Sequence, residues 1–435
     1  MSKSYIKSSS LKPKYKKLLI IAVILFVAII VLETAASLFT SEPAWFSETT
    51  NTYGDVQVTL DSNSLKSQFY SIQSEPYFLT RNFYKQKQGE EKRIFIVGDD
   101  LVAGWPYTKN QSVGKKIEKI LLKYNVKDKV ELILISFAGF NSNYAVEFLS
   151  QLAEYKPDMV ILFLGHNEFY THEDLTPRII GRYSNILSII NKWLLQSGLR
   201  KKIPYENSID DLGLIISGES ANQAIINTDS RYYDRIDKFE SNISWIIEFC
   251  DSNGIDLVLP LLSDNLIIPP LGIIQNASES QADIIYNNAR MAILRDGDIT
   301  KAHELFYKSK ELDAVKLRIP GDIKNFYVNT ISDKTIVLRI DSLLNLHCES
   351  DIPSSKLFLD YVHPNVNGLN IIASTLAERI IRNLDEMVES ISFDSILSFS
   401  NKSCTISNED SVIAEIRLER AANKIANTNW SDTSK

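Results

Sequence analysis

The chain has 435 residues, of which 44% are hydrophobic and 23% charged, and its formal net charge at pH 7 is −7. These proportions are those of an ordinary globular protein of one large domain or two. The net negative charge, with no strong basic cluster beyond the N-terminus, argues against nucleic acid as a partner. Cys250, Cys348 and Cys404 are an odd set without CxxC spacing, so neither a zinc site nor a disulfide framework is indicated.

The basic N-terminus is followed by a long apolar run. Lysines at positions 12, 14, 16 and 17 precede residues 18–39, which are mostly apolar and about as long as one membrane-spanning helix. Positive charge before this segment predicts a cytoplasmic basic segment at 1–17, a transmembrane anchor at 18–39 and an extracytoplasmic domain beyond it. A cleavable signal peptide with small residues at 34–36 is the alternative, and it also exports the domain. A buried core helix fits the lysine flank and the uniform apolarity poorly.

Beyond the anchor, residues 40–91 mix polar and aromatic side chains without clear periodicity, which indicates a linker and an edge element. From residue 92 to 387, short apolar runs alternate with amphipathic helical patterns. This alternation predicts an α/β fold in which helices cover both faces of a parallel sheet. The predicted strands are residues 93–97, 130–136, 159–164, 255–262 and 335–340. Five such strands give a three-layer, doubly wound, flavodoxin-like domain whose ligand crevice lies at the carboxyl ends of the strands.

Two insertions and a tail complete the predicted organisation. Residues 171–231 contain no recognisable strand, and the segment forms either a lid over the crevice or packing filler. Residues 280–325 resemble a tetratricopeptide-type helical hairpin, and a single unit of this kind must pack on the main domain to bury its apolar face. Residues 388–435 are a polar C-terminal tail in which the amphipathic stretch 412–425 either docks or frays.

Three short patches carry the chemistry. Residues 94–101 read Ile-Phe-Ile-Val-Gly-Asp-Asp-Leu and contain Asp100, residues 164–170 read Leu-Gly-His-Asn-Glu-Phe-Tyr and contain Asn167, and residues 360–365 read Asp-Tyr-Val-His-Pro-Asn. Asp360 and His363 are three residues apart, so a tight turn can place the carboxylate on one ring nitrogen while the other faces the crevice. This is how a histidine base is oriented in nucleophilic catalysis.

Together the patches resemble the SGNH hydrolases, serine esterases of the GDSL type, whose first strand ends in Gly-Asp-Ser-Leu. The resemblance runs from about residue 93 to 384, and the Gly-His-Asn-Glu-Phe-Tyr block is similar to a membrane-anchored subgroup. It implies that Asp100 stands at the nucleophile position, with His363 as the base and Asp360 as its acid. It also implies an anion hole made by the amide of Asp100, by Gly139 and by the Asn167 side chain. His166 and Glu168 are interpreted as local structural residues.

The chain departs from this family at the nucleophile itself, because Asp100 replaces the serine. A carboxylate has no proton to give near neutral pH, so ordinary serine-esterase turnover is expected to fail. In the first of three hypotheses, Asp100 pairs with His363 and fills the anion hole, which leaves a non-hydrolytic or weakened protein. In the second, Asp100 is the nucleophile of an altered hydrolase and His363 activates water. In the third, ranked last, Asp99, Asp100, Asn167 and His363 hold a hard metal ion.

The expected partners follow from the same features. The N-terminal helix predicts attachment to a membrane. The resemblance implies an acylated or acetylated substrate at the cell envelope, that is, an ester or an acetylated sugar, and no cofactor.

Overall fold

The computed structural model describes residues 13–37, 46–52, 55–60, 82–136, 139–169, 225–272, 282–330, 334–384 and 391–427. The chain divides into two units, and residues 13–37 are the described part of the smaller one. All other described residues belong to the larger unit.

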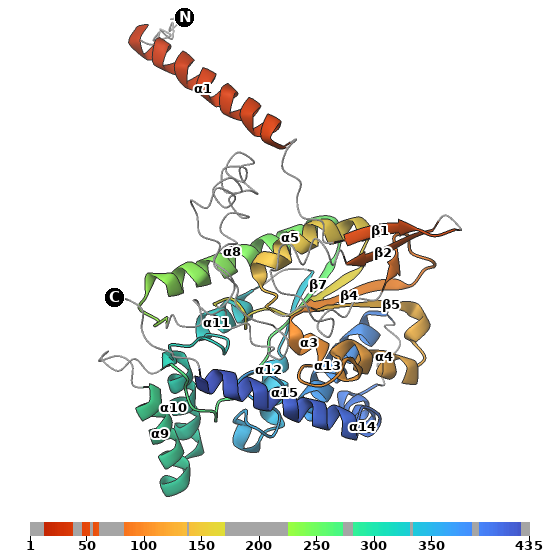
Figure 1. Cartoon of the computed structure of the whole chain (residues 1–435), viewed down its shortest axis with the longest axis vertical. Coiled ribbons are helices and arrows are strands. Elements are labelled where there is room, and N and C mark those ends of the chain that lie inside the picture. The colour runs from red at the N-terminus through yellow and green to blue at the C-terminus, as the bar shows by residue number, and fades with distance from the viewer. Residues whose placement is uncertain are drawn as a thin grey trace, which may run out of the picture. The chain divides into compact units, whose positions relative to one another are not determined.

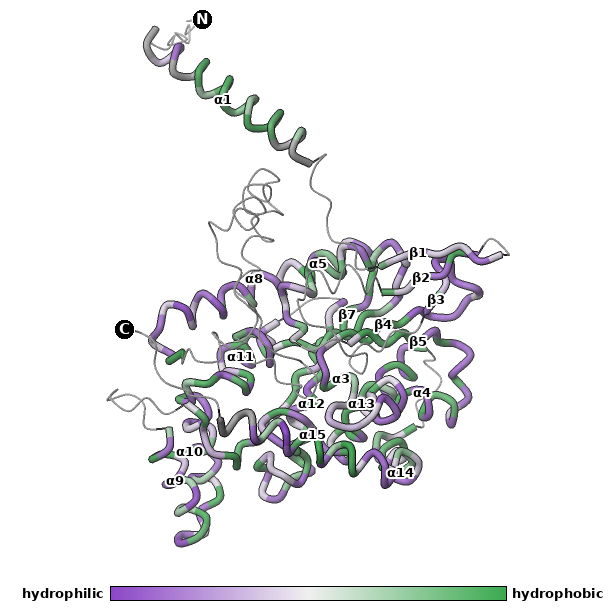
Figure 2. The backbone as a smooth tube through the Cα atoms, in the orientation of Figure 1, coloured by the Kyte–Doolittle hydropathy of each residue, from purple (hydrophilic) through white to green (hydrophobic). Residues whose placement is uncertain are grey.

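The smaller unit contains helix α1, Pro13–Ser37, which overlaps the predicted anchor at 18–39. Its residues 20–32 are exposed, and Figure 2 colours much of the helix as hydrophobic. Among the residues that the structure describes, no helix is both long enough and apolar enough to span a membrane. The membrane anchor therefore stays a prediction.

The larger unit is built on a parallel sheet of five strands, as the sequence predicts. The strand order is β5-β4-β6-β7-β8, so the chain winds outward from β4 in both directions, the doubly wound arrangement. Gly98 lies opposite Ser136 and Val97 opposite Leu162, which brings the carboxyl ends of β5, β4 and β6 to one edge of the sheet. The strands are β4 Lys92–Gly98, β5 Val130–Ser136, β6 Met159–Leu162, β7 Asp256–Pro260 and β8 Thr335–Leu338.

Helices cover both faces of this sheet (Figure 1). One face carries α4, Val113–Lys123, and α13, Val366–Leu384, which pack on Ile94 and Ile96 of β4 in the main apolar core. The other face carries α5, Ser142–Leu152, and α8, Ser230–Asn253. The shorter helical elements are α3 Asp100–Ala103, η2 Lys109–Gln111, η3 Lys127–Lys129, η4 Ala153–Tyr155, α12 Ile340–Leu346 and η8 Glu349–Asp351.

The predicted edge element is a small antiparallel sheet of its own, in the order β1-β2-β3. Its strands are β1 Phe46–Thr50, β2 Val56–Leu60 and β3 Phe83–Tyr84. Phe46 packs on Tyr155 with the ring centroids 4.8 Å apart, and Phe83 packs edge-on to Phe95 at 5.4 Å. Aromatic contacts of this kind hold the small sheet against the main domain.

The insertion predicted at 280–325 is helical. Its elements are α9 Ala282–Met291, the π-helical turn η7 Ala292–Asp296, α10 Ile299–Leu312 and α11 Gly321–Asn329. Phe306 and Ala302 of α10 form a small core with Leu266 and Ile352 of the main domain, so the hairpin does not stand alone. The resemblance of this insertion to tetratricopeptide units stays a prediction. Of the insertion predicted at 171–231, residues 171–224 lie outside the described residues.

The segment predicted as a polar tail forms two helices, α14 Phe393–Ser403 and α15 Asn408–Asn427. Ile396 and Leu397 of α14 and Ala414 of α15 join the main apolar core, and polar bonds add to this docking. Arg417 Nη1 donates to the carbonyls of Pro106 at 2.9 Å and Tyr107 at 2.7 Å, and the buried Lys116 donates from Nζ to the carbonyl of Cys404 at 3.3 Å. A positive charge beside the last carbonyls of a helix interacts favourably with the helix dipole, so Lys116 stabilises the C-terminal end of α14.

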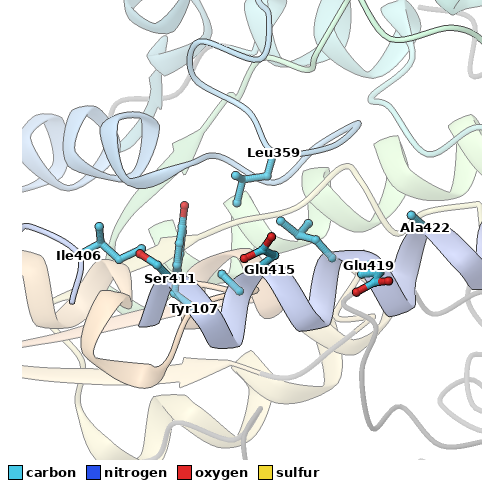
Figure 3. A pocket seen from close by; sticks show the side chains of 9 residues that line it. Tyr107, Leu359, Ile406, Ser411, Glu415, Glu419 and Ala422 are labelled. Atoms are coloured by element: carbon cyan, nitrogen blue, oxygen red, sulfur yellow. The ribbon is translucent and has the colours of Figure 1, made fainter. Parts of the chain in front are cut away.

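A groove of about 500 Å³ runs along α15. In Figure 3, Leu359 faces α15 across the groove. Leu359 immediately precedes Asp360, so the groove borders the loop of the predicted acid and base. The full lining is Tyr107, Leu359, Ile406, Ser411, Ala414, Glu415, Leu418, Glu419 and Ala422.

Candidate active site

Asp99 and Asp100 lie where β4 turns sharply into α3. Asp99 caps the helix, since its Oδ1 accepts a hydrogen bond from Leu101 N at 3.1 Å. Gly98 is needed at the turn because a Cβ there would lie 2.5 Å from Cγ2 of Val102 and 2.8 Å from Cβ of Phe163. The turn presents Asp100 at the carboxyl edge of the sheet, the position that the sequence predicts for a nucleophile.

The structure brings Asp100, His363 and Asp360 together. His363 Nε2 lies 3.3 Å from Asp100 Oδ2, and His363 Nδ1 lies 2.7 Å from Asp360 Oδ2. The second oxygen of Asp360 accepts from the backbone N–H groups of Val362 at 2.9 Å and His363 at 2.8 Å, which fixes the turn. Asp100 is 1% and His363 2% exposed. One imidazole therefore sits between two carboxylates, almost out of contact with solvent.

The two carboxylates decide the charge of the imidazole. Burial lowers the pKa of His363, but the charges and hydrogen bonds of Asp360 and Asp100 outweigh it and hold that pKa well above its usual range. Burial likewise raises the pKa of Asp360, but the charge and hydrogen bonds of His363, together with the bond from Val362 N, outweigh burial and lower that pKa. A raised pKa favours the imidazolium form, in which both ring nitrogens donate and no lone pair is left to act as a base.

Trp105, which the sequence analysis did not single out, covers this imidazole. Its ring centroid is 4.3 Å from that of His363, and the residue is buried. An indole face close to a cation stabilises it by the ring quadrupole. Trp105 follows Asp100 by five residues, with Trp105 N donating to Asp100 O at 3.0 Å, so the short helix α3 positions both residues.

Asn167 donates to Asp99. Asn167 Nδ2 lies 2.8 Å from Asp99 Oδ2 and 3.4 Å from the carbonyl of Phe140. Burial, followed by the charge of Asp100, raises the pKa of Asp99 to about 6. The sequence analysis predicts an anion-hole role for Asn167 and no hydrogen bond between Asn167 and Asp99, so sequence reasoning missed this contact. Gly139 follows β5 with a φ of 74°, and its part in an anion hole stays a prediction.

The residues on either side of Asn167 fasten its segment to other elements. Glu168 accepts from Ser142 N at 3.1 Å and from Ser142 Oγ at 2.7 Å, at the start of α5. Burial raises the pKa of Glu168 to about 7. His166 Nε2 lies 3.1 Å from Oδ1 of Asp264, in the loop after β7. These two contacts fasten the Asn167 segment to the start of α5 and to the loop after β7.

Asp264 links this segment to the helical insertion. It is fully buried, and its Oδ2 lies 3.1 Å from Lys324 Nζ and 3.4 Å from Lys310 Nζ. Burial raises the pKa of Asp264, but the charges of Lys324 and Lys310 and the hydrogen bond of His166 outweigh it and hold that pKa well below its usual range. The insertion thus supplies the charges that allow an ionised carboxylate behind the site.

The third hypothesis places a hard metal ion among Asp99, Asp100, Asn167 and His363. Among the side chains that the structure places, no group of three or more His, Cys, Asp or Glu residues has an arrangement that could hold a metal ion.

No protein-family model matches the chain, and no curated protein matches it in sequence. Solved structures that resemble it include an acetyl xylan esterase, at 17% identity and a TM-score of 0.31 over 66% of this chain and 99% of that one. A GDSL-like lipase from Bacteroides thetaiotaomicron matches at 13% identity and 0.33 over 68% and 90%. A putative acylhydrolase from Bacteroides fragilis matches at 12% and 0.33 over 75% and 98%.

Proposed function

We propose that this chain is a membrane-anchored, extracytoplasmic protein with an SGNH-hydrolase-like scaffold that does not carry out serine-esterase turnover. The observation that carries the proposal is the 3.3 Å contact between Asp100 Oδ2 and His363 Nε2 in a buried site. A carboxylate at the nucleophile position keeps the imidazole charged, so the step in which a base takes a proton from a nucleophile is absent. The crevice then binds a ligand without cleaving it.

The remaining parts of the proposal rest on the sequence. The lysines at 12, 14, 16 and 17, at the start of α1 and just ahead of its apolar stretch, support an anchor with its N-terminus in the cytoplasm and a domain at the cell envelope. The resemblance to SGNH hydrolases suggests acylated or acetylated envelope material as the ligand. An altered hydrolase, with Asp100 as a covalent nucleophile, is the alternative. It is disfavoured because a carboxylate paired with an imidazolium is a weakened nucleophile beside a base that is already protonated.

An ester assay tests the proposal. With a short-chain aryl ester, the wild type and His363→Ala are expected to show the same rate, equal to the rate without protein, because His363 has no catalytic step to perform. Mass spectrometry of the peptide containing Asp100, taken during the incubation, is expected to show the unmodified mass. Turnover by the wild type that disappears in His363→Ala, or an acyl adduct on Asp100, would establish the altered hydrolase instead.

A further inference from the structure

Asn265 holds the loop that carries Asp360 and His363 by two hydrogen bonds. This buried residue follows β7, and its backbone N–H donates to the carbonyl of Tyr361 at 3.0 Å. Its side-chain Nδ2 donates to the carbonyl of Asp360, also at 3.0 Å. The Asn265 Oδ1 accepts from Ile267 N at 3.2 Å, which fixes the orientation of the amide. Both of the donated bonds end on the two-residue segment that directly precedes the turn to His363.

Arg318 fixes Asn265 in turn. This buried arginine lies between α10 and α11, and its Nη1 donates to the carbonyl of Asn265 at 3.2 Å. Its Nη2 donates to Asp313 Oδ2 at 2.9 Å, so the guanidinium is held in place by a buried ion pair. The Arg318 Cζ also lies 5.5 Å from the centroid of the Tyr361 ring, whose hydroxyl donates to the carbonyl of Pro269 at 3.1 Å.

These contacts form one connected path from the helical insertion to the imidazole. Arg318 holds the Asn265 backbone, Asn265 holds the Asp360 and Tyr361 carbonyls, and Asp360 holds His363 at 2.7 Å. Buried asparagine and arginine side chains often only stabilise a fold. Here, however, both act on the segment whose position sets the distance between the acid and the imidazole.

We propose that Asn265 and Arg318 are positioning residues for His363, and that the insertion 282–329 therefore helps to set the geometry of the site. The inference rests on the proposed function only in taking the Asp100–His363–Asp360 cluster as the centre of the site. Displacing the loop lengthens the contact between Asp360 and His363. The imidazolium then loses stabilisation while the burial that disfavours it remains.

The test is an NMR titration of the full chain labelled at histidine, which has five histidines to assign. Asn265→Leu removes the side-chain bonds at similar volume, and we expect the titration midpoint of His363 to fall relative to the wild type. The matched control is Asn370→Leu, which removes another buried asparagine whose bonds run to Lys116 and Asn401. It is expected to cost stability and to leave the His363 midpoint unchanged.

Two variants of Arg318 test the same positioning role independently of Asn265. Arg318→Met is expected to lower the midpoint and Arg318→Lys to lower it less, and these variants decide the question if Asn265→Leu does not fold. A midpoint unchanged in Asn265→Leu and Arg318→Met, or lowered equally in Asn370→Leu, overturns the positioning role. Asp100→Asn separates the two proposals. A midpoint that falls in Asp100→Asn but not in the positioning variants defeats only this inference, whereas one unmoved by Asp100→Asn defeats the proposed function.

Discussion

Replacing Asp100 by serine is expected to give this chain an esterase activity that the wild type lacks. The substitution puts a hydroxyl at the turn between β4 and α3 and removes one of the two carboxylates in contact with His363. Asp360 remains on Nδ1 at 2.7 Å, so the imidazole keeps its orientation while Nε2 becomes free to accept the serine proton. General-base assistance of this kind is worth about 10²–10⁴-fold in rate.

Hydrolysis of a short-chain aryl ester measures the gain. Asp100→Ser is expected to exceed the wild type by about 100-fold or more, and the activity should rise with pH as His363 loses its proton. Asp100→Ala removes the same carboxylate without supplying a nucleophile and is the control, expected to stay at background. If Asp100→Ser is no faster than Asp100→Ala, then His363, Asp360 and the predicted anion hole do not support esterase catalysis.

Asp264→Asn is expected to be among the most destabilising substitutions of a single polar side chain in this fold. The change removes the negative charge that compensates Lys310 and Lys324 in a fully buried position, while an amide of similar size remains. Breaking a buried ion pair by removing one partner costs about 3–5 kcal/mol, because a charge stays buried without that partner. Lys310 keeps Glu311 at 3.1 Å, so the loss falls mainly on Lys324. The loss should also loosen His166, which contacts the same carboxylate, and with it the Asn167 segment.

Urea unfolding gives the free energy directly. Glu378→Gln is the matched control because Glu378 pairs with Arg382 at 2.8 Å at the surface, where such a pair contributes at most about 1 kcal/mol. A loss below about 1 kcal/mol for Asp264→Asn would show that the lysine charges are compensated by other groups.

The sheet was predictable because its strands are short apolar runs bounded by polar residues. The sequence predicts the strand at 130–136 with its observed bounds, and the strand at 93–97 to within one residue. The last three strands are shorter than the predicted 159–164, 255–262 and 335–340, because apolar side chains continue past the hydrogen-bonded ladder. Strand β6 ends at Leu162, β7 ends at Pro260, and Ile340 already begins α12.

The small sheet and helix α15 were harder to predict from the sequence. In the small sheet only a few side chains, such as Phe46, Val58 and Phe83, are buried, so no period emerges from residues 40–91. Helix α15 buries only small side chains such as Ala414 and Ala421 and makes polar bonds through Arg417 and Asp410, while its Val412 and Ile416 are exposed. The amphipathic pattern at 412–425 therefore could not decide whether the helix docks. Contacts of this kind depend on partners about 300 residues away in sequence.

Within the site, the sequence identified residues whose local motif is diagnostic and missed those defined only in space. Asp100, Asp360 and His363 belong to recognisable patches, and the structure brings them into contact. Trp105 has no motif, and its place over His363 depends on how α3 packs. The bond between Asn167 and Asp99 joins residues 68 positions apart, and no spacing rule for either residue indicates it.

The most direct test of the account is the protonation state of His363 in the wild-type protein, read from the ¹⁵N shifts of its imidazole at pH 7.5. Since Asp100 and Asp360 hold the pKa of His363 well above its usual range, both ring nitrogens are expected to carry a proton at this pH. In Asp100→Asn the proton should leave Nε2 at lower pH than in the wild type. A wild-type imidazole that is neutral at pH 7.5, with a midpoint near the ordinary value of about 6.5, would contradict the proposal that Asp100 keeps His363 charged.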